Sequence, residues 1–373
     1  MRIGFDAKRA FANKTGLGNY SRFVLNALMT FEKQHEYDAY TPKDNQNLFP
    51  DFPKSSIHFP ETFLDKKLSA FWRYSNITNQ LSKDKVDIFH GLSNEVPQGL
   101  SLKGIKSVVT IHDLIFERLP ELFKPVDRRI YRHKFQSACK RSDRIVAVSE
   151  QTKRDLVELY HVDPERIHVI YQDCNPVFKR MTDHEESTKI LGLYGIELPF
   201  ILSVGTLEER KNQHRLVEAF ANARTSDFKL ILVGKPTSYS QKIRETIRHY
   251  GLEKQVLILQ NVPTDHLPAL YQSAEIFAYI SIYEGFGIPI LEALHSGTPV
   301  LSAKGSCLEE AGGPGGLYAD PYKTEDISHQ LGKLITDVNL RKSLVSAGKR
   351  HIEQFTGKNI AGQLIDLYQN MIR

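Results

Sequence analysis

Short apolar segments alternate with helical patterns along most of the chain. The segments are rich in Val, Ile and Phe, and several are apolar nearly throughout, as strands buried on both faces of a sheet are. They predict strands at 2–5, 86–90, 107–111, 144–148 and 167–171, and then at 200–204, 229–233, 256–259, 276–280 and 299–302. Alternation of strands with helices predicts parallel sheets.

The helical patterns have legible starts and one long interruption. Ser149 is suited to N-cap a helix from Glu150, and Thr264 a helix from Asp265. The alternation pauses at 172–199, so we expect an interdomain linker near 173–180. This predicts two doubly wound α/β domains, residues 1–175 and 176–357, facing across a cleft. The tail from 324 to 373 predicts helices only, and the glycine-rich stretch 312–316 predicts a loop.

Composition agrees with an ordinary globular protein of two domains. The chain has 373 residues, 41% of them hydrophobic and 25% charged. Its three cysteines, Cys139, Cys174 and Cys307, form no C-x-x-C motif, which argues against a disulfide framework or a structural zinc site. No apolar run reaches about 18 residues, and the first residues lack a signal-peptide core. We therefore expect a cytoplasmic protein.

Candidate functional residues follow the predicted strands, because doubly wound sheets bind ligands beyond the carboxyl ends of their strands. Three such places stand out: the glycine loop 15–20 (TGLGNY), His112, and the cations of 205–212 (GTLEERKN). The glycine loop fits an anion site at a helix start or a plain turn, since Ser21 replaces the last glycine of a dinucleotide fingerprint. His112 fits a structural or a catalytic histidine. Arg210 and Lys211 fit a phosphate site or a solvated turn.

The stretch 281–293 (SIYEGFGIPILEA) carries the most specific pattern. In one continuous helix Glu284 and Glu292 would lie roughly 80° apart around the axis and could not face one point. Pro289, however, suits the first turn of a helix and would break its interior. Glu284 is therefore expected in a loop and Glu292 in the first helical turn, with backbone N–H groups of 285–287 between them. Such a loop can hold one extended ligand with hydroxyls at each end.

Taken together, these motifs resemble the retaining GT-B glycosyltransferases of family 4, also called glycosyl transferases group 1. The resemblance covers nearly the whole chain and rests on 15–20, His112-Asp113, 144–150 (RIVAVSE), 205–212 and the E-x7-E pattern of 284–292. It implies a GT-B fold of two Rossmann-like domains, with the last helix, about 358–373, packing back onto the first. It also implies an enzyme that moves a hexose from a nucleotide diphosphate sugar to a glycan or lipid-linked saccharide.

The resemblance also implies roles for single residues. Glu292 would bind the donor ribose, and Glu284 would bind the transferred sugar or its phosphate together with the backbone of Gly285, Phe286, Gly287 and Ile288. Lys211 would neutralise the leaving diphosphate, and His112 would touch the sugar and stabilise the transition state. Gly16 and Gly18 would close over the donor, and Val262 would edge the base. No Asp-x-Asp pair occurs in the chain, which fits an enzyme without a metal ion or other cofactor.

The sequence departs from the family at one phosphate contact. Many members have Arg after the glycine that corresponds to Gly205, where this chain has Thr206, and Arg210 is a candidate to supply the missing charge. The motif 205–212 with the glycine loop resembles the mannosyl- and rhamnosyl-transferring members of the family, which implies mannose from GDP-mannose as the donor, with UDP-sugars and other donors open. A silent sugar-nucleotide-binding subunit and an oxidoreductase are the competing classes. The oxidoreductase leaves the paired carboxylates unexplained.

A basic segment remains. The net charge is +5, and Arg128, Arg129 and Arg132 lie close to Tyr131 and Phe135 in a predicted helix. Such a helix either is solvated or meets an anionic membrane surface, at about 1 kcal/mol per cation. The membrane alternative predicts peripheral association with the inner face of the plasma membrane, and we expect no nucleic-acid partner.

Overall fold

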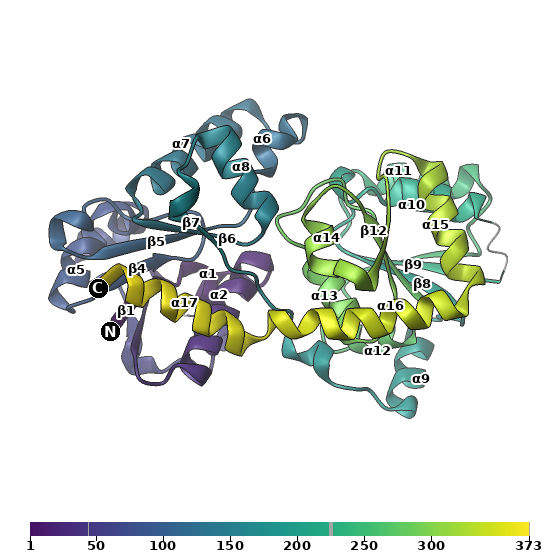
Figure 1. Cartoon of the computed structure of the whole chain (residues 1–373), viewed down its shortest axis with the longest axis horizontal. Coiled ribbons are helices and arrows are strands. Elements are labelled where there is room, and N and C mark those ends of the chain that lie inside the picture. Colours follow the sequence, from purple (N-terminus) through teal and green to yellow (C-terminus); the bar gives the residue numbers. More distant parts are fainter. Residues whose placement is uncertain (44, 224–226, 373) are drawn as a thin grey trace. The chain divides into compact units, whose positions relative to one another are not determined.

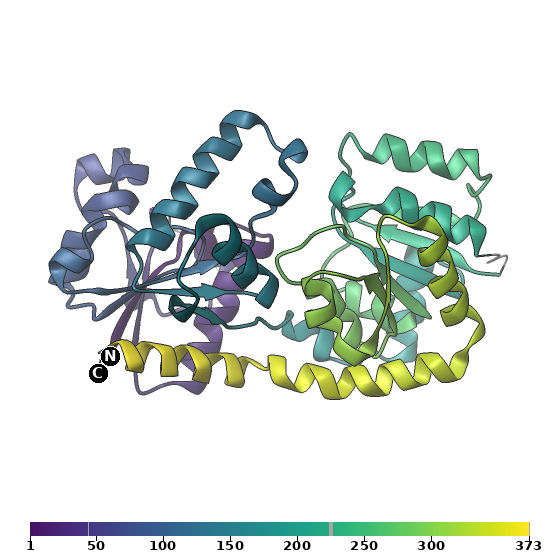
Figure 2. The ribbon, with the colours of Figure 1, turned by 45° about the horizontal axis from the view of Figure 1, so that its top comes forward.

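The computed structural model describes residues 1–43, 45–223 and 227–372 and divides the chain into two compact units. The first unit is Met1–Asp173 together with Phe355–Arg373, and the second is Cys174–Gln354. Each unit contains one sheet with helices on both of its faces (Figures 1 and 2). Residue 373, the last of the predicted tail helix, lies outside the described residues.

The sheet of the first unit has seven parallel strands. Its order is β3-β2-β1-β4-β5-β6-β7. The strands are β1 (Arg2–Asp6), β2 (Glu36–Tyr40), β3 (Ile57–His58), β4 (Ile88–Gly91), β5 (Lys106–Ile111), β6 (Arg144–Ala147) and β7 (Ile167–Val169). The centre of this sheet is fully buried: Phe5 of β1 pairs with Ala39 on one side and with His90 on the other.

Helices cover both faces of the first sheet. They are α1 (Lys8–Ala12), α2 (Gly16–Phe31), α3 (Phe63–Lys67), α4 (Ser69–Phe71), α5 (Ile77–Lys83), α6 (Ile115–Arg118), α7 (Pro125–Arg141), α8 (Glu150–Tyr160) and α17 (Gly357–Ile372). Figure 1 shows α7 and α8 on one side and α2 and α17 on the other. The C-terminal helix α17 packs on α2, and its Tyr368 hydroxyl lies 2.6 Å from His90 Nδ1.

The second unit repeats the same architecture. Its six parallel strands have the order β10-β9-β8-β11-β12-β13. The strands are β8 (Phe200–Val204), β9 (Lys229–Val233), β10 (Val256–Leu259), β11 (Ile276–Tyr279), β12 (Val300–Ala303) and β13 (Gly316–Ala319). In order along the chain this is 3-2-1-4-5-6, the arrangement of doubly wound nucleotide-binding sheets. The order reverses between β8 and β11, and ligands of such sheets bind at that switch point, beyond the carboxyl ends of the strands.

The helices of the second unit lie in two layers. They are α9 (His184–Leu193), α10 (Gln213–Asn222), α11 (Ser240–His249), α12 (Leu267–Ser273), α13 (Ile288–His295), α14 (Cys307–Gly312), α15 (Thr324–Thr336) and α16 (Val338–His351). Figure 1 shows α10, α11 and α15 on one face of the sheet and α12 and α13 on the other. On the first face, Leu216, Ile243 and Leu331 belong to one buried core with the strands.

The predicted fold class is confirmed, and each of the ten predicted strands overlaps an observed one. Three observed strands were missed. The sequences of β2 (EYDAY) and β13 (GLYA) carry charged residues or glycine, and β3 has only two residues. These strands have weak intrinsic strand propensity and form because they pair with a neighbouring strand, so their own sequences do not predict them.

Local details divide in the same way. Ser149 caps α8 as predicted, because its hydroxyl accepts a hydrogen bond from the N–H of Thr152. The predicted helix start at Thr264 and Asp265 is wrong: α12 begins at Leu267, and no side chain caps it. The loop predicted for 312–316 is also wrong, since 313–315 form a 3-10 turn and Gly316 opens β13. No helix among the described residues has the length and apolar character needed to cross a bilayer.

Candidate active site

Two loops of the second unit meet at the switch point of its sheet. The first follows β8 and contains the 3-10 turn Glu209–Lys211; the second follows β11 and leads into α13. They are joined through one carbonyl, since the Arg210 oxygen accepts a hydrogen bond from the N–H of Ile282 at 2.8 Å, and the Ser281 hydroxyl oxygen lies 3.1 Å from the same carbonyl oxygen. The cations of one loop and the carboxylate of the other are thereby held together.

The carboxylate of Glu284 is the centre of this site. Its Oε1 accepts from Lys211 Nζ at 2.5 Å, from the Ser281 hydroxyl at 2.6 Å and from the Tyr279 hydroxyl at 3.0 Å. Its Oε2 lies 2.6 Å from the guanidinium of Arg210. The loop that was expected to carry a ligand-binding acid therefore presents that acid already bound to two cations.

Burial and pairing act in opposite directions on these groups. Burial alone would raise the pKa of Glu284, but the charges of Lys211 and Arg210 outweigh it and lower the pKa to about 2. Burial lowers the pKa of Lys211, and the attraction of Glu284 offsets part of that shift. At neutral pH the site is thus a charged cluster of two cations and one shared anion, in a place where water is scarce.

Arg210 was the candidate to replace the phosphate cation missing at Thr206. Its guanidinium is largely buried and also donates to Glu208 Oε1 at 2.7 Å and to the Tyr283 carbonyl at 2.6 Å. Arg210 is thus paired with the carboxylates of both Glu208 and Glu284, so its positive charge is already compensated in the absence of a ligand. A phosphate role for Arg210 stays a prediction.

Glu292 lies on α13, as expected for its distance from Pro289. Pro289 occupies the first turn of that helix, as predicted, but α13 begins at Ile288, which places Glu292 in the second turn and not in the first. Its Oε2 accepts a hydrogen bond from the Tyr271 hydroxyl at 2.8 Å. Burial raises the pKa of Glu292 to about 7, and the hydrogen bond from Tyr271 only partly opposes that shift. The two carboxylates therefore differ in charge state near neutral pH.

The backbone between the two acids is shaped by Gly287. This residue has φ of +140° at the start of α13, and a Cβ there would lie 3.0 Å from the Leu308 side chain and 3.1 Å from that of Ala311. Both the backbone angle and the packing require glycine. The segment Gly285–Ile288 brings its backbone to the N-terminus of α13, where N–H groups favour anions. Val262, the candidate for the base, follows β10 of the same sheet.

In the first unit, His112 directly follows β5 and is almost completely buried. Its Nε2 lies 2.9 Å from the Leu92 carbonyl; since a carbonyl only accepts, Nε2 carries the proton and Nδ1 is left as an acceptor. Burial lowers the pKa of His112 to about 4. The imidazole is therefore neutral at neutral pH, and any stabilisation it gives to a transition state comes from its dipole rather than from a full charge.

The glycines of the first unit differ from their expected setting. A short helix, α1, precedes them, and Gly16 and Gly18 form the first turn of α2 instead of a loop. A Cβ on Gly18 would come within 1.9 Å of the Asn13 carbonyl oxygen, so packing alone requires glycine at this position. A Cβ on Gly16 would meet nothing within 4 Å. The donor role of these glycines stays a prediction.

The basic segment forms most of α7, and some of its cations have partners on other elements. Arg132 pairs with Glu117 at 2.5 Å, and Arg128 donates to the Phe116 carbonyl. Arg129 is exposed and, among the described residues, takes part in no ion pair. Glu117 therefore compensates the charge of Arg132, whereas Arg128, bonded to a neutral carbonyl, and the exposed Arg129 keep theirs.

Sequence reasoning missed the side chains that support the two acids. Tyr279, Ser281 and Tyr271 all bond to Glu284 or Glu292, but each reads as an ordinary strand, loop or helix residue. One signal could have identified Tyr279: it is the last residue of β11, and the ends of strands beside a switch point are where ligand sites form.

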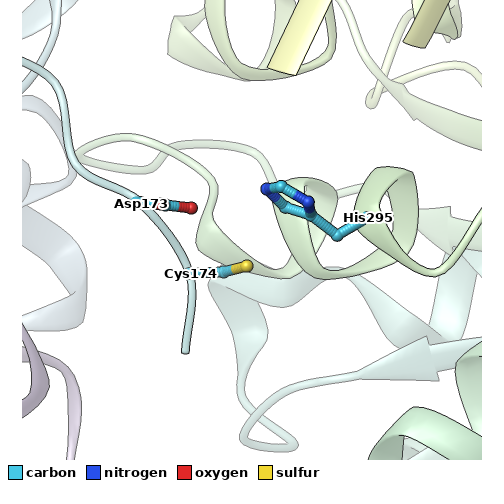
Figure 3. A group of neighbouring side chains, drawn as sticks. All are labelled: Asp173, Cys174 and His295. Carbon is cyan, nitrogen blue, oxygen red and sulfur yellow. The ribbon is translucent and has the colours of Figure 1, made fainter. Parts of the chain in front are cut away.

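It also missed a group formed by Cys174 and His295 with Asp173, which precedes Cys174 in the chain (Figure 3). One ligand atom from each lies within 4.8 Å of the others. These residues are too far apart in the sequence for spacing to reveal them. Three ligand atoms do not by themselves define a metal site, and we assign none.

The two doubly wound units agree with a GT-B fold, and comparison with known proteins shows the class, a glycosyltransferase. Residues 16–172 match the model of the Glycosyltransferase Family 4 domain, and residues 189–351 match that of Glycosyl transferases group 1. The chain belongs to the GT-B glycosyltransferases of family 4.

Its relatives include mannosyltransferases. O-antigen chain mannosyltransferase B of Escherichia coli is 29% identical over 76% of this chain and 74% of its own length. O-antigen chain mannosyltransferase RfbU of Salmonella typhimurium is 28% identical over 57% of this chain and 56% of its own. The crystal structure of Anabaena Alr3699/HepE with UDP-glucose has a TM-score of 0.77 and 19% identity, covering 99% of this chain and 100% of that one. That likeness shows the shared fold.

The raised pKa of Glu292 predicts a pH-dependent stability. A carboxyl group with a pKa of about 7 when folded and about 4.5 when unfolded stabilises the folded state below pH 4.5 and loses that contribution as the pH rises through 7. Between pH 5 and pH 8 the wild type should therefore lose about 2 kcal/mol of unfolding free energy relative to Glu292→Gln. Urea unfolding of both proteins at the two pH values measures this; a constant difference would show that Glu292 is already ionised at pH 5.

Proposed function

We propose that the protein transfers a hexose, with mannose from GDP-mannose as its preferred donor, to a glycan or lipid-linked saccharide, with retention of configuration at the sugar. The observation that carries this proposal is the cluster of Lys211, Arg210 and Glu284 at the switch point of the second sheet, beside the N-terminus of α13. The mannosyltransferase names of its relatives support the choice of sugar.

The chemistry explains why such a cluster is useful. When the bond between the sugar and the diphosphate breaks, its electron pair stays on the leaving phosphate oxygen, and positive charge develops on the sugar. Lys211 and the first N–H groups of α13 are placed to stabilise the growing negative charge, and they act more strongly in a site with little water. Glu284 then faces the sugar or its phosphate, and the second carboxylate, Glu292, faces the ribose hydroxyls.

We further propose that the reaction needs no divalent metal ion, because the positive charge that the leaving group requires is supplied by side chains and a helix terminus. The chain has no Asp-x-Asp pair to hold a metal ion. In the first unit, His112 would contact the sugar as a neutral imidazole. Gly16 and Gly18 would approach the donor, and Val262 of the second unit would edge its base.

A donor screen tests this proposal. The protein is incubated with GDP-mannose, UDP-glucose, ADP-glucose and dTDP-sugars, with EDTA present, and release of the nucleoside diphosphate is measured together with the thermal shift. GDP-mannose is expected to give the largest shift and slow hydrolysis in the absence of acceptor. Hydrolysis of UDP-glucose alone would reject the preferred donor and keep the enzyme class. Binding of a donor without any turnover would favour a silent sugar-nucleotide-binding subunit, and a requirement for Mg²⁺ would reject the metal-independent mechanism.

We also propose that α7 meets the anionic cytoplasmic face of the membrane, where a lipid-linked acceptor would be found. Its first half exposes Val126 (70%) and Ile130 (47%) beside Arg129, an arrangement that suits a helix lying in a lipid interface. Because Glu117 compensates the charge of Arg132 and Arg128 is half-buried against the Phe116 carbonyl, the exposed Arg129 should carry most of the electrostatic part.

Arg129→Glu is therefore expected to weaken binding to anionic vesicles about 5–30-fold, since about 1 kcal/mol is lost with each cation and an anion is added. Cosedimentation at low salt measures the change, and Arg244→Glu on the exposed face of α11 is the control. Vesicle binding that weakens neither at higher salt concentration nor with Arg129→Glu would refute an electrostatic contact through α7.

A further inference from the structure

Tyr279 is a buried residue that touches two members of the candidate site. It is the last residue of β11 and is only 4% exposed. Its hydroxyl accepts a hydrogen bond from Lys211 Nζ at 2.5 Å and donates one to Glu284 Oε1 at 3.0 Å. The roles implied by the sequence include no part for this side chain.

The direction of both hydrogen bonds follows from the chemistry of the partners. An ammonium group has no acceptor, so the tyrosine oxygen must accept from Lys211 and its own proton is free for the carboxylate. Burial is the largest cause that raises the pKa of Tyr279 well above its usual value, and the negative charge of Glu284 adds to it. The hydroxyl therefore stays protonated and keeps this orientation across the neutral pH range.

The ring of Tyr279 is held as firmly as its hydroxyl. It stacks on Phe277 with ring centroids 6.0 Å apart and an interplanar angle of 17°. The Lys211 ammonium lies 4.9 Å from the centre of the same ring, on the side of its hydroxyl. A rigid aromatic side chain thus supplies a rigid hydrogen-bond acceptor.

These contacts determine the orientation of the Lys211 ammonium. A lysine ammonium carries three N–H donors on a tetrahedral nitrogen. One is directed to Tyr279 and one to Glu284, both at 2.5 Å. When two of the three directions are set, the third has only one direction left, and it remains available to an oxygen of a bound diphosphate.

We propose that Tyr279 is a positioning residue for the transfer reaction: it keeps the third N–H of Lys211 directed at the leaving diphosphate while the bond from the sugar carbon to the phosphate oxygen breaks. This inference rests on the proposed function. Tyr279 itself touches no substrate. It acts through Lys211, because without its hydroxyl the ammonium can rotate about the single remaining contact with Glu284.

The first test is Tyr279→Phe, which keeps the ring and its stacking on Phe277 and removes only the hydroxyl. A misdirected N–H costs most where the charge is largest, in the transition state, so kcat should fall about tenfold while KM changes less than about twofold. Tyr318→Phe is the matched control, because it removes another tyrosine hydroxyl bond in the same unit, to the Gly313 carbonyl at 2.7 Å. The control should leave both constants unchanged.

The second test separates positioning from a general loss of structure. If Tyr279 acts through Lys211, Tyr279→Phe should lower single-turnover donor cleavage less than about twofold in a Lys211→Met background, against about tenfold in the wild type. Such non-additivity is expected only for residues that share one function. A loss that is equal in both backgrounds would overturn the inference and assign Tyr279 a structural role.

Two further outcomes separate a failure of this inference from a failure of the proposed function. A wild-type protein that turns over its donor while Tyr279→Phe has the same kcat overturns this inference alone and leaves the proposed function standing. A wild-type protein that cleaves no nucleotide sugar contradicts the proposed function, and this inference fails with it.

Discussion

Replacing Lys211 by Met is expected to lower kcat by about 10²–10³-fold with a much smaller change in donor binding. Removal of one preorganised charge or donor from a developing anion typically costs this much. Lys211 is well placed for such an effect, because its Nζ is buried and lies within 2.5 Å of both Tyr279 and Glu284. Methionine keeps the length and the apolar stem of the side chain, so the loss isolates the ammonium.

Steady-state kinetics with the preferred donor measures this effect, and thermal unfolding confirms that the variant is folded. Lys229→Met is a suitable control, because Lys229 forms an ion pair with Glu197 at 3.1 Å at the other end of β9 from the site. It should retain full activity. A Lys211→Met protein with kcat within threefold of the wild type would remove Lys211 from the catalytic machinery and pass the diphosphate role to Arg210.

Replacing Glu284 by Gln is expected to destabilise the donor-free protein by about 3 kcal/mol at neutral pH. A pKa of about 2 against an unfolded value of 4.5 corresponds to about 3 kcal/mol of stabilisation by the two cations. The neutral amide leaves Lys211 and Arg210 buried without an anion, which is costly in its own right. Glu275→Gln is the control, because its pair with Arg341 is half exposed on the glutamate side and should be worth less than about 1 kcal/mol.

The pH dependence of this difference has a definite sign. Because the pKa of Glu284 is lowered on folding, its contribution is fully present above about pH 4.5 and is lost as the pH falls towards 2. The stability gap between wild type and Glu284→Gln should therefore shrink from about 3 kcal/mol at pH 6 to about 1 kcal/mol at pH 3. A gap that stays constant over this range would mean that the charge of Glu284 does not matter to the fold.

The same variant separates two roles of Glu284. In the donor-free protein its carboxylate neutralises the cations that a diphosphate would need, so the diphosphate must share or displace it. Free GDP or UDP should therefore stabilise Glu284→Gln more than it stabilises the wild type, while transfer is lost because the contact with the sugar is gone. Weaker stabilisation by both nucleoside diphosphates would show that Glu284 helps to assemble the phosphate site and does not compete with it.

In the segment 281–293, the sequence determined the local backbone and the tertiary structure determined the partners of Glu284. Its composition determined that a loop carries Glu284 and that a helix with proline in its first turn carries Glu292, because proline and glycine restrict the backbone locally. The same residues gave no sign that Glu284 would be bound to both cations from 205–212. That pairing depends on β8 and β11 lying side by side, a consequence of strand order.

The apolar segments behaved similarly. Strands buried on both faces, such as β8 and β9, could be located because their burial requires apolar side chains throughout. The strands β2 and β13 could not be located, since a neighbour supplies the hydrogen bonds that hold them. The partner of Arg132 in the basic segment could not be predicted for a related reason: Glu117, which pairs with it, is on another helix, and the sequence of α7 gives no sign of that contact.

By itself, then, the sequence determined the class of fold, the family and the chemical types of residue at the switch point, because these depend on periodicity and on local backbone restrictions. Only the tertiary structure decided the raised pKa of Glu292, the partners of Glu284 and the hydrogen bonds of Tyr279 to Lys211 and Glu284. Burial and pairing between segments distant in the chain set these properties, and neither is a property of any one segment.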